Sequence, residues 1–342
     1  MIQKKNLLKI RTPAKLILSG EHAVVYGNPA LAVAINLYTN VTIRKTASLC
    51  FSFNFKNLNF RKLVALQELR KLQKKLEIRY QQYCLGYLDI QEVLKNPSEL
   101  SLFTFIKVLN CVKNNLPMSI DTIIDSDIPI GYGIGSSAAS VVGLVHALTQ
   151  FLNINLNSED YFKLSIESEN LQHGYSSGLD IYTVYYGGCI RYAKGKFEKR
   201  FIPNFSMQLV QTGRPKSNTG ECVLQASSLF KKSRIGDDFS AITNELDQAL
   251  QNCNFENIKN CIQQNHRLLK TIGVVPNKID CFIIDVEKIG GSAKICGAGS
   301  IQGDNGGSVL VITDNPINNL IQQYDYSVVP IRIDSQGVQC IV

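Results

Sequence analysis

The chain has 342 residues, of which 45% are hydrophobic, 19% charged and 8% aromatic. This apolar content can offset chain entropy, so the composition excludes a disordered protein. Because domains usually hold roughly 100–200 residues, the length predicts two lobes. The formal net charge of +8 favours anionic ligands, among them nucleotides, carboxylates and nucleic acid.

Neither a membrane span nor a secretion signal is predicted. No apolar run reaches the roughly 18 residues that a spanning helix needs, and lysines and an arginine interrupt the first 15 residues. Ten cysteines are scattered without a CxxC pair, which predicts reduced thiols packed like small hydrophobic side chains. We therefore expect a cytoplasmic protein without a disulfide framework or a zinc site.

The first half of the chain predicts a β-sheet followed by long helices. Leucines recur at helical spacing through a basic stretch at 61–79, which predicts an amphipathic helix with a solvated basic face. Short apolar or alternating runs predict strands at 7–10, 16–18, 41–44, 49–55 and 120–124. Helical periodicity predicts helices at 60–83, 100–112 and 136–152.

The character of the sequence changes after Gly187 and Gly188, where short strands and amphipathic helices alternate. We expect a lobe boundary here, with residues 1–187 in one lobe and 188–342 in the other, and an α+β fold. The predicted strands are 190–192, 208–210, 293–296, 308–312, 326–332 and 338–342. The predicted helices are 219–232, 236–251, 254–270, 277–288 and 316–323.

The strongest motif is the string IPIGYGIGSSAA at 128–139. Its three alternating glycines let backbone N–H groups turn towards one point, and the helix that follows adds the positive end of its dipole. The motif therefore predicts a phosphate site, in which Ser136 and Ser137 can cap the helix or offer a hydroxyl to phosphate or magnesium. The spacing matches neither a Walker loop nor a Rossmann fingerprint.

Three further motifs contain charged residues or are rich in glycine. In TPAKLILSGEHAVVYG at 12–27, Lys15, Glu21 and His22 can present charge to an anionic hydroxy acid. Glu169 and Asp180 lie eleven positions apart in a stretch that ends before a YGG turn. Another glycine-rich segment, KICGAGSIQGDNGGS, occupies 294–308.

Together the four motifs resemble, in the same order, those of the mevalonate kinases within the GHMP superfamily of galactokinases, homoserine kinases, mevalonate kinases and phosphomevalonate kinases. The turn at 131–135 resembles that superfamily's PxGxGLGSSAA loop, and GEHAVVYG is most similar to mevalonate kinases. The segment 294–308 resembles KxTGAGGGG, with Cys296 in place of threonine and a longer loop at 300–305. The resemblance implies a ribosomal-protein-S5-like N-terminal lobe that binds the nucleotide. It also implies a ferredoxin-like C-terminal lobe that completes the substrate site.

The resemblance also implies an activity, namely the ATP-dependent phosphorylation of the primary hydroxyl of mevalonate to 5-phosphomevalonate, with ATP and Mg²⁺ as cofactors. Asp180 and Lys15 are the implied catalytic residues, and Ser137 and Glu169 the implied metal ligands. The implied substrate-binding residues are Lys15, Glu21, His22 and Asp180. The implied ATP-binding residues are Gly131, Gly133, Ile134, Gly135, Ser136, Ser137 and Ala138, and the C-terminal glycine loop is Gly297, Ala298 and Gly299.

Several alternatives stay open at this point. Mevalonate kinases commonly carry two arginines in an Arg-Ser-Thr-Arg string, whose counterpart at 216–220 ends in Gly220, so Arg214 and Lys216 are the candidates for gripping a carboxylate. Phosphomevalonate kinase, mevalonate 3-kinase, a sugar or homoserine kinase, and a non-catalytic nucleotide-binding regulator are the other functions considered. A nucleic-acid binder working through 61–79 is a further class, which the lack of a known module disfavours. We expect neither a nucleic-acid nor a membrane partner and leave a homodimer open.

Overall fold

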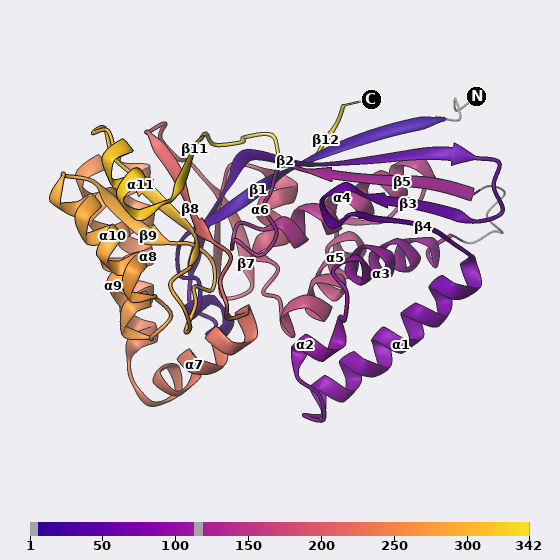
Figure 1. Cartoon of the computed structure of the whole chain (residues 1–342), viewed down its shortest axis with the longest axis horizontal. Coiled ribbons are helices and arrows are strands. Elements are labelled where there is room, and N and C mark those ends of the chain that lie inside the picture. The colour runs from indigo at the N-terminus through magenta and orange to yellow at the C-terminus, as the bar shows by residue number, and fades with distance from the viewer. Residues whose placement is uncertain (1–5, 113–118, 342) are drawn as a thin grey trace.

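The computed structural model describes residues 6–112 and 119–341, which form two lobes, each built on its own β-sheet (Figure 1). The larger lobe holds most of the first half of the chain, and the smaller lobe holds most of the second half. Within the described residues, no helix is both long enough and apolar enough to cross a membrane.

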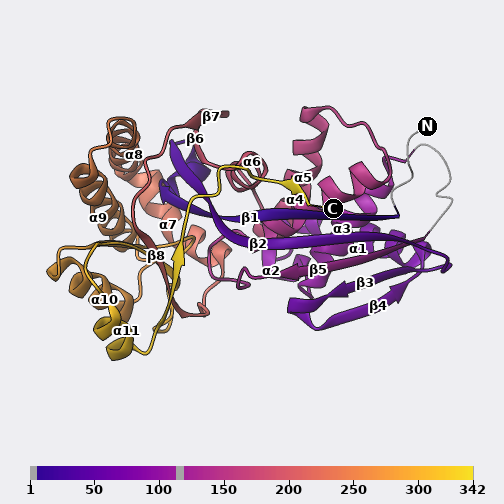
Figure 2. The same ribbon diagram turned by 90° about the horizontal axis from the view of Figure 1, so that it is seen from above.

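The large sheet has eight strands within the described residues, in the order β12-β1-β2-β5-β3-β4, with β6 on β2 and β7 on β6. Its pairs are antiparallel except β3 with β5. The long strands β1 and β2 run from the body of the large sheet towards the small lobe (Figure 2). The strands are β1 (Leu7–Ser19), β2 (Ala30–Thr46), β3 (Phe51–Phe55), β4 (Phe60–Val64), β5 (Ser119–Ser126), β6 (Cys189–Ala193), β7 (Lys196–Arg200) and β12 (Gln339–Cys340).

The small sheet is antiparallel and has the order β11-β8-β10-β9. Its strands are β8 (Met207–Gly213), β9 (Ser292–Ile295), β10 (Gly307–Ile312) and β11 (Ser327–Ile331). β9 and β10 are buried at every residue, as expected for strands covered by helices. The predicted lobe boundary at 187/188 stays a prediction; β6 and β7, which follow it, belong to the large sheet.

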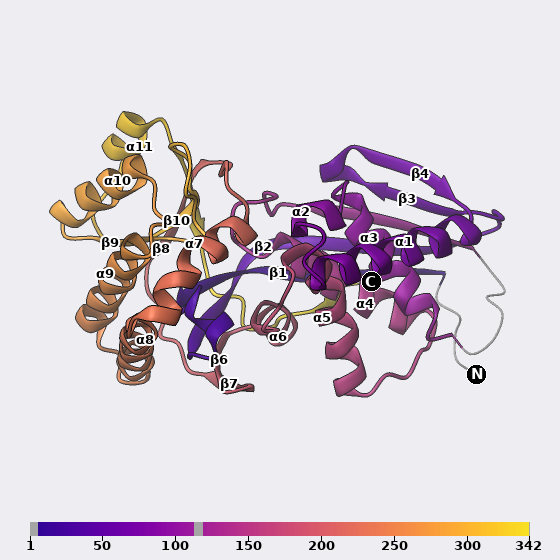
Figure 3. The same cartoon turned by 90° about the horizontal axis from the view of Figure 1, so that it is seen from below.

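Helices cover one face of the large sheet, where α4 packs on β1 and β2 and is flanked by α3 and α5 (Figure 3). These helices are α1 (Leu66–Cys84), α2 (Ile90–Val93), α3 (Ser98–Leu109), α4 (Ser136–Phe151), α5 (Ser158–His173) and α6 (Leu179–Tyr186). In the small lobe, α9 and α10 pack on β9, and α8 packs on α9. The small-lobe helices are α7 (Thr219–Lys232), α8 (Ile235–Gln251), α9 (Phe255–Thr271), α10 (Asn277–Lys288) and α11 (Asn318–Tyr324). Two short 3-10 helices, η1 (Ala23–Tyr26) and η2 (Lys56–Leu58), lie in the connections.

Most of the predicted elements are present. One prediction is wrong, at β4, the second strand of the β3–β4 hairpin. The predicted helix at 60–83 begins only at Leu66, because Asn59 turns the chain in the left-handed region and Phe60–Val64 pairs with β3. The sequence analysis did not identify α2, α5, α6 or β7. Of the predicted last strand at 338–342, residue 342 lies outside the described residues.

The cysteines fit their expected packing in part. Cys189, Cys222, Cys261 and Cys296 carry free, buried thiols, and burial raises the pKa of Cys189 to about 12. Cys281, by contrast, is exposed, because it lies on the outer face of α10.

Candidate active site

The glycine-rich turn between β5 and α4 forms one wall of the site. Gly131, Gly133 and Gly135 have φ angles of +83°, +77° and +80°, which glycine adopts without strain. Gly135 is the N-cap of α4, and no side chain caps this helix end. The N–H groups of the first turn of α4, beginning at Ser136, are therefore left for an anion, which the helix dipole also favours.

Lys15 and Asp180 form an ion pair beside this turn. Lys15 Nζ lies 2.8 Å from Asp180 Oδ2, and the two side chains are 4% and 27% exposed. The backbone N–H of Lys15 donates to the carbonyl of Ile134 at 3.1 Å, and its side chain crosses Gly135 so closely that a Cβ there would be 2.7 Å from Lys15 Cγ. Lys15 comes from β1 and Asp180 from the first turn of α6, so the pair exists only in the folded chain.

Ser137, Glu169 and His173 form a second cluster at the same helix end. Ser137 Oγ donates to Glu169 Oε2 at 3.2 Å, and His173 Nε2 lies 3.4 Å from both of these oxygens. Burial alone would lower the pKa of His173, but the hydrogen bond to Glu169 and the charges of Glu169 and Asp180 outweigh it and raise that pKa. The cluster thus lies within electrostatic reach of the Lys15–Asp180 pair.

The donor set of this cluster fits a hard divalent cation. Glu169 is 1% exposed, and its second oxygen, Oε1, is buried without a hydrogen-bond partner. Such an orphaned acceptor is costly unless a cation or another donor meets it. Ser137 and Glu169 offer one hydroxyl and one carboxylate, and Mg²⁺ usually takes one or two protein ligands together with phosphates.

The C-terminal glycine loop touches the phosphate turn directly. A Cβ on Gly133 would lie 2.7 Å from the carbonyl oxygen of Cys296 and 3.1 Å from Gly297 Cα. The two glycine segments therefore meet backbone to backbone, and any side chain at Gly133 would push them apart. Cys296, at the position where threonine is expected, is 1% exposed.

The longer loop at 300–305 folds back onto the start of the small lobe. Ile301 N–H donates to Ser217 Oγ at 3.1 Å, and Asn305 Nδ2 donates to the carbonyl of Arg214 at 3.4 Å. Lys216 packs against Gly303 of this loop. The additional residues thus fix the segment that carries Arg214 and Lys216.

Arg214 lies at the phosphate turn, since a Cβ on Gly131 would be 3.4 Å from its Nε. It is exposed and has no ion-pair partner among the residues that the structure describes. Gly220, the position without the expected arginine, lies in α7 and faces Ile90.

Glu21 and His22, two of the predicted substrate-binding residues, are buried and contact other parts of the protein. Glu21 forms an ion pair with Lys294, and its Oε2 accepts a hydrogen bond from Asn265 Nδ2 at 3.1 Å. His22 Nε2 donates to the carbonyl of Ala298, in the C-terminal glycine loop, at 3.0 Å. Burial lowers the pKa of His22 to about 4, so its imidazole is neutral at pH 7.

The chain has clear relatives of known activity. Residues 104–188 match the family model of the GHMP kinases N terminal domain. The mevalonate kinase of Thermococcus gammatolerans is 30% identical over 302 residues, which cover 84% of this chain and 85% of that protein. The chain belongs to the mevalonate kinase family.

Other members of the family agree with this assignment. The mevalonate kinase of Methanocaldococcus jannaschii is 29% identical over 318 residues, covering 89% of this chain and 91% of that protein. The crystal structure of the Methanococcus jannaschii mevalonate kinase matches with a TM-score of 0.78 at 26% identity, over 95% of this chain and 98% of that one. The resemblance drawn from the four motifs and the two-lobed GHMP kinase fold that it implied are therefore confirmed.

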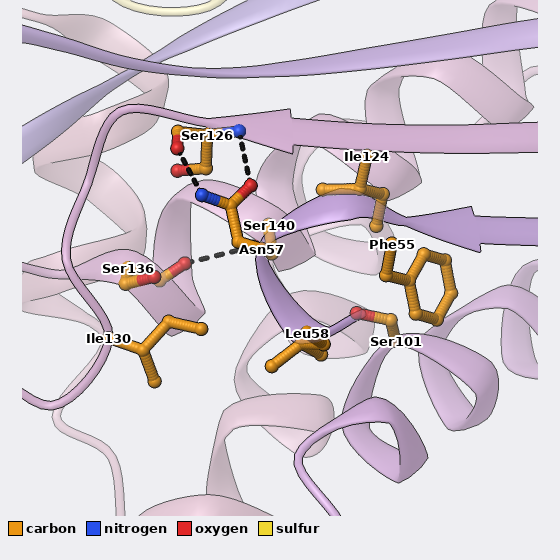
Figure 4. A pocket seen from close by; sticks show the side chains of 9 residues that line it. All are labelled: Phe55, Asn57, Leu58, Ser101, Ile124, Ser126, Ile130, Ser136 and Ser140. Atoms are coloured by element: carbon orange, nitrogen blue, oxygen red, sulfur yellow. Dashed lines mark hydrogen bonds between the residues drawn. The ribbon is translucent and has the colours of Figure 1, made fainter. Parts of the chain in front are cut away.

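A small cavity in this mevalonate kinase family member adjoins the phosphate turn (Figure 4). Ser136 and Ser140 of α4 line one side, and Asn57, whose amide is held by hydrogen bonds to the backbone of Ser126, lines another. Phe55, Leu58, Ile124 and Ile130 add apolar walls, and Ser101 a hydroxyl. A flat, partly polar group attached to the bound phosphates could enter here.

The sequence analysis missed three groups at this site. His173 could have been found, because it follows Glu169 by four residues and therefore lies on the same face of a helix. Lys294 opens the fourth motif, but its pairing with Glu21 joins residues 273 positions apart. No local signal identifies the cavity, because its walls come from separate strands and helices.

Proposed function

We propose that this mevalonate kinase family member transfers the γ-phosphoryl group of ATP to the primary hydroxyl of mevalonate, giving 5-phosphomevalonate and ADP. The observation that carries the proposal is the gathering of the Lys15–Asp180 pair and the Ser137–Glu169 pair at the uncapped start of α4. Phosphoryl transfer needs positioning and charge neutralisation more than covalent chemistry, and this site supplies both.

The nucleotide phosphates are proposed to lie on the turn before α4, where N–H groups and the helix dipole meet an anion. The adjoining cavity then receives the base, since Ser136 borders both the turn and the cavity (Figure 4). The proposed phosphate-binding residues are Gly131, Gly133, Ile134, Gly135, Ser136, Ser137 and Ala138.

Ser137 and Glu169 are the proposed protein ligands of Mg²⁺. The ion would neutralise charge on the β and γ phosphates when bound. The orphaned Oε1 of Glu169 supports this role, because it is buried and otherwise has no donor. His173 orients the same carboxylate through its contact with Oε2.

Asp180 is the proposed general base. Its carboxylate accepts the proton of the primary hydroxyl while the hydroxyl oxygen bonds to the γ-phosphorus, and the bond to the β,γ-bridging oxygen breaks to release ADP. Lys15 lies against both Asp180 and the phosphate turn, so its charge can hold the base in place and stabilise negative charge on the transferred group.

The mevalonate carboxylate needs a cationic partner, and Arg214 and Lys216 are the proposed ones. The alternative substrates phosphomevalonate, homoserine and a sugar differ from mevalonate in charge and size, so this region decides between them. A cytoplasmic location, a homodimer and the lack of a nucleic-acid partner stay predictions.

A coupled ADP-release assay over mevalonate, 5-phosphomevalonate, homoserine, galactose and shikimate tests the proposal. We expect turnover with mevalonate at a kcat/KM at least tenfold above that with any other alcohol. A higher value with another alcohol would reassign the substrate within the superfamily. ATP binding without turnover of any alcohol would instead indicate a nucleotide-binding regulator.

A further inference from the structure

A buried ion pair joins the two lobes behind the active site. Lys294, at the third residue of β9, is completely buried, and its ammonium contacts the carboxylate of Glu21, whose side chain is 2% exposed. Lys294 Nζ also donates to the carbonyl of Ile17 in β1 at 2.8 Å. Burial lowers the pKa of Lys294 to about 8, an effect that Cys296 opposes and the charge of Lys15 strengthens.

Polar side chains of the small lobe complete this junction. Asn265 on α9 donates to Glu21 and accepts from Ser19 Oγ at 2.9 Å, so its amide holds the carboxylate and the end of β1 together. Ser19 Oγ also lies 2.7 Å from Thr243 Oγ1 on α8. Thus the end of β1 is tied to β9, α8 and α9 by buried polar contacts.

Both ends of the pair lead directly to catalytic segments. Glu21 follows Lys15 by six residues, and the next residue, His22, holds the carbonyl of Ala298. Lys294 precedes Cys296 by two residues, and the carbonyl of Cys296 lies against Gly133. A shift of Lys294 relative to Glu21 would therefore move the C-terminal glycine loop relative to the phosphate turn.

The pair is costly to bury and is closed to solvent. A buried ion pair is often no more stabilising than a hydrophobic pair of similar volume, so stability alone gives little reason for these residues. One Glu21 oxygen is occupied by Lys294 and the other by Asn265. Both oxygens of this buried carboxylate thus already contact donors of the small lobe, whereas the sequence predicted that Glu21 would contact the substrate.

We infer that Glu21 and Lys294 are a pair of positioning residues, which fix the C-terminal glycine loop against the phosphate turn across the two lobes. This inference rests on the proposed function for its kinetic consequence. Its structural consequence, a defined loop position, is independent of the substrate.

A double-mutant cycle tests the pair, using Glu21→Gln, Lys294→Met and the double variant, with kcat and both KM values measured well below the lowest Tm. We expect each single change to lower kcat by roughly 10- to 100-fold, since a displacement near 1 Å can cost this much. The double variant should be no worse than the poorer single variant, because it leaves no unpaired buried charge.

Asp247→Asn is the matched structural control. Asp247 on α8 also joins the lobes, through Arg200 of β7 at 3.1 Å, but neither β7 nor α8 leads to a glycine loop. This variant should lower Tm and leave kcat unchanged. If Glu21→Gln raised KM for mevalonate alone, and the effects of the two changes were additive, Glu21 would be a substrate contact and the inference would be wrong.

Hydrogen exchange of the folded protein tests whether Glu21 and Lys294 hold the C-terminal glycine loop in place, even if the wild type does not phosphorylate mevalonate. The amides of 296–300 should exchange at least tenfold faster in Lys294→Met than in the wild type and should be unchanged in Asp247→Asn. If a single variant fails to fold, the double variant serves in its place. Equal exchange of this loop in the wild type and in the Lys294 variants would overturn the inference, whereas absent turnover in the wild type would overturn only the proposed function.

Discussion

Lys15 Nζ and Asp180 Oδ2 lie 2.8 Å apart, although β1 and α6 place these residues 165 positions apart in the chain. The pair lies beside Gly135, at the start of the helix that would hold the phosphates. If Asp180 accepts the substrate proton, Asp180→Asn should lower kcat by roughly two to four powers of ten. The Kd of ATP should change little, because Asp180 does not contact the phosphate turn in this role. Turnover in the variant like that of the wild type would remove Asp180 from the mechanism.

The metal site predicts a specific response to magnesium. Glu169→Gln should raise the Mg²⁺ concentration for half-maximal activity by roughly 10- to 100-fold, the usual effect of disturbing a metal site. Glu167→Gln, two residues away on the same helix, is the matched control, because Glu167 pairs with Lys107 at the surface. A titration at fixed ATP that is identical in all three proteins would point to other ligands.

The contact between the two glycine segments predicts the effect of a single methyl group. Gly133→Ala should raise KM for ATP by roughly tenfold or more, because the new Cβ would lie 2.7 Å from Cys296 O and displace the loop. Gly195→Ala has a similar φ of +79° but nothing within 4 Å of the added Cβ. It should cost only the strain of the left-handed backbone, on the order of 1 kcal/mol in the free energy of unfolding. Equal KM values in the two variants would argue against close packing of the loops.

His22 predicts a loss of stability in acid. Its pKa is about 4 in the folded protein and 6.5 in the unfolded chain, so the unfolded state binds more protons as the pH falls below 6.5. Between pH 7 and pH 5 this residue should remove about 2 kcal/mol from the free energy of unfolding. Urea denaturation of the wild type and of His22→Gln at both pH values measures this. The difference between the two pH values should shrink by that amount in the variant, and an unchanged difference would show that the imidazole is not buried neutral.

Substitution of Arg214 shows which of two anionic ligands, ATP or mevalonate, this side chain binds. Because Arg214 is a proposed partner of the mevalonate carboxylate, Arg214→Gln should raise KM for mevalonate more than KM for ATP, by roughly 3- to 10-fold. Lys216→Gln, on the neighbouring segment at Gly303, is the comparison. A larger rise in KM for ATP in Arg214→Gln would instead assign this arginine, which lies beside Gly131 of the phosphate turn, to the nucleotide phosphates.

The sequence predicted local elements well wherever a single periodicity ran without interruption. The predicted helices 219–232 and 277–288 agree with α7 and α10, because their apolar stripes are regular and Asn218 caps α7. The predicted start of the helix at Phe60 is wrong, because residues 60–64 form the strand β4 and α1 begins only at Leu66. Basic residues mixed with leucine occur in strands as well as in helices, so the local sequence does not distinguish the two. Only the pairing of Phe60–Val64 with β3 decides between them, and this is a tertiary effect.

The same distinction applies to the site. The phosphate turn is predictable because three glycines and two serines are local to one segment. The partners of Glu21 are not, since Lys294 and Asn265 reach it only after the two lobes pack together. A charged residue in a motif thus indicates a buried or functional position, whereas the three-dimensional fold decides whether it faces a ligand or another part of the protein.

A crystal structure of the enzyme with mevalonate and a non-hydrolysable ATP analogue tests the central claim most directly. The account predicts the primary hydroxyl of mevalonate within hydrogen-bond distance of Asp180, and the γ-phosphate on the turn at Gly133–Ser137, between Lys15 and Glu169. A γ-phosphate bound away from the start of α4, or a hydroxyl out of reach of Asp180, would contradict it.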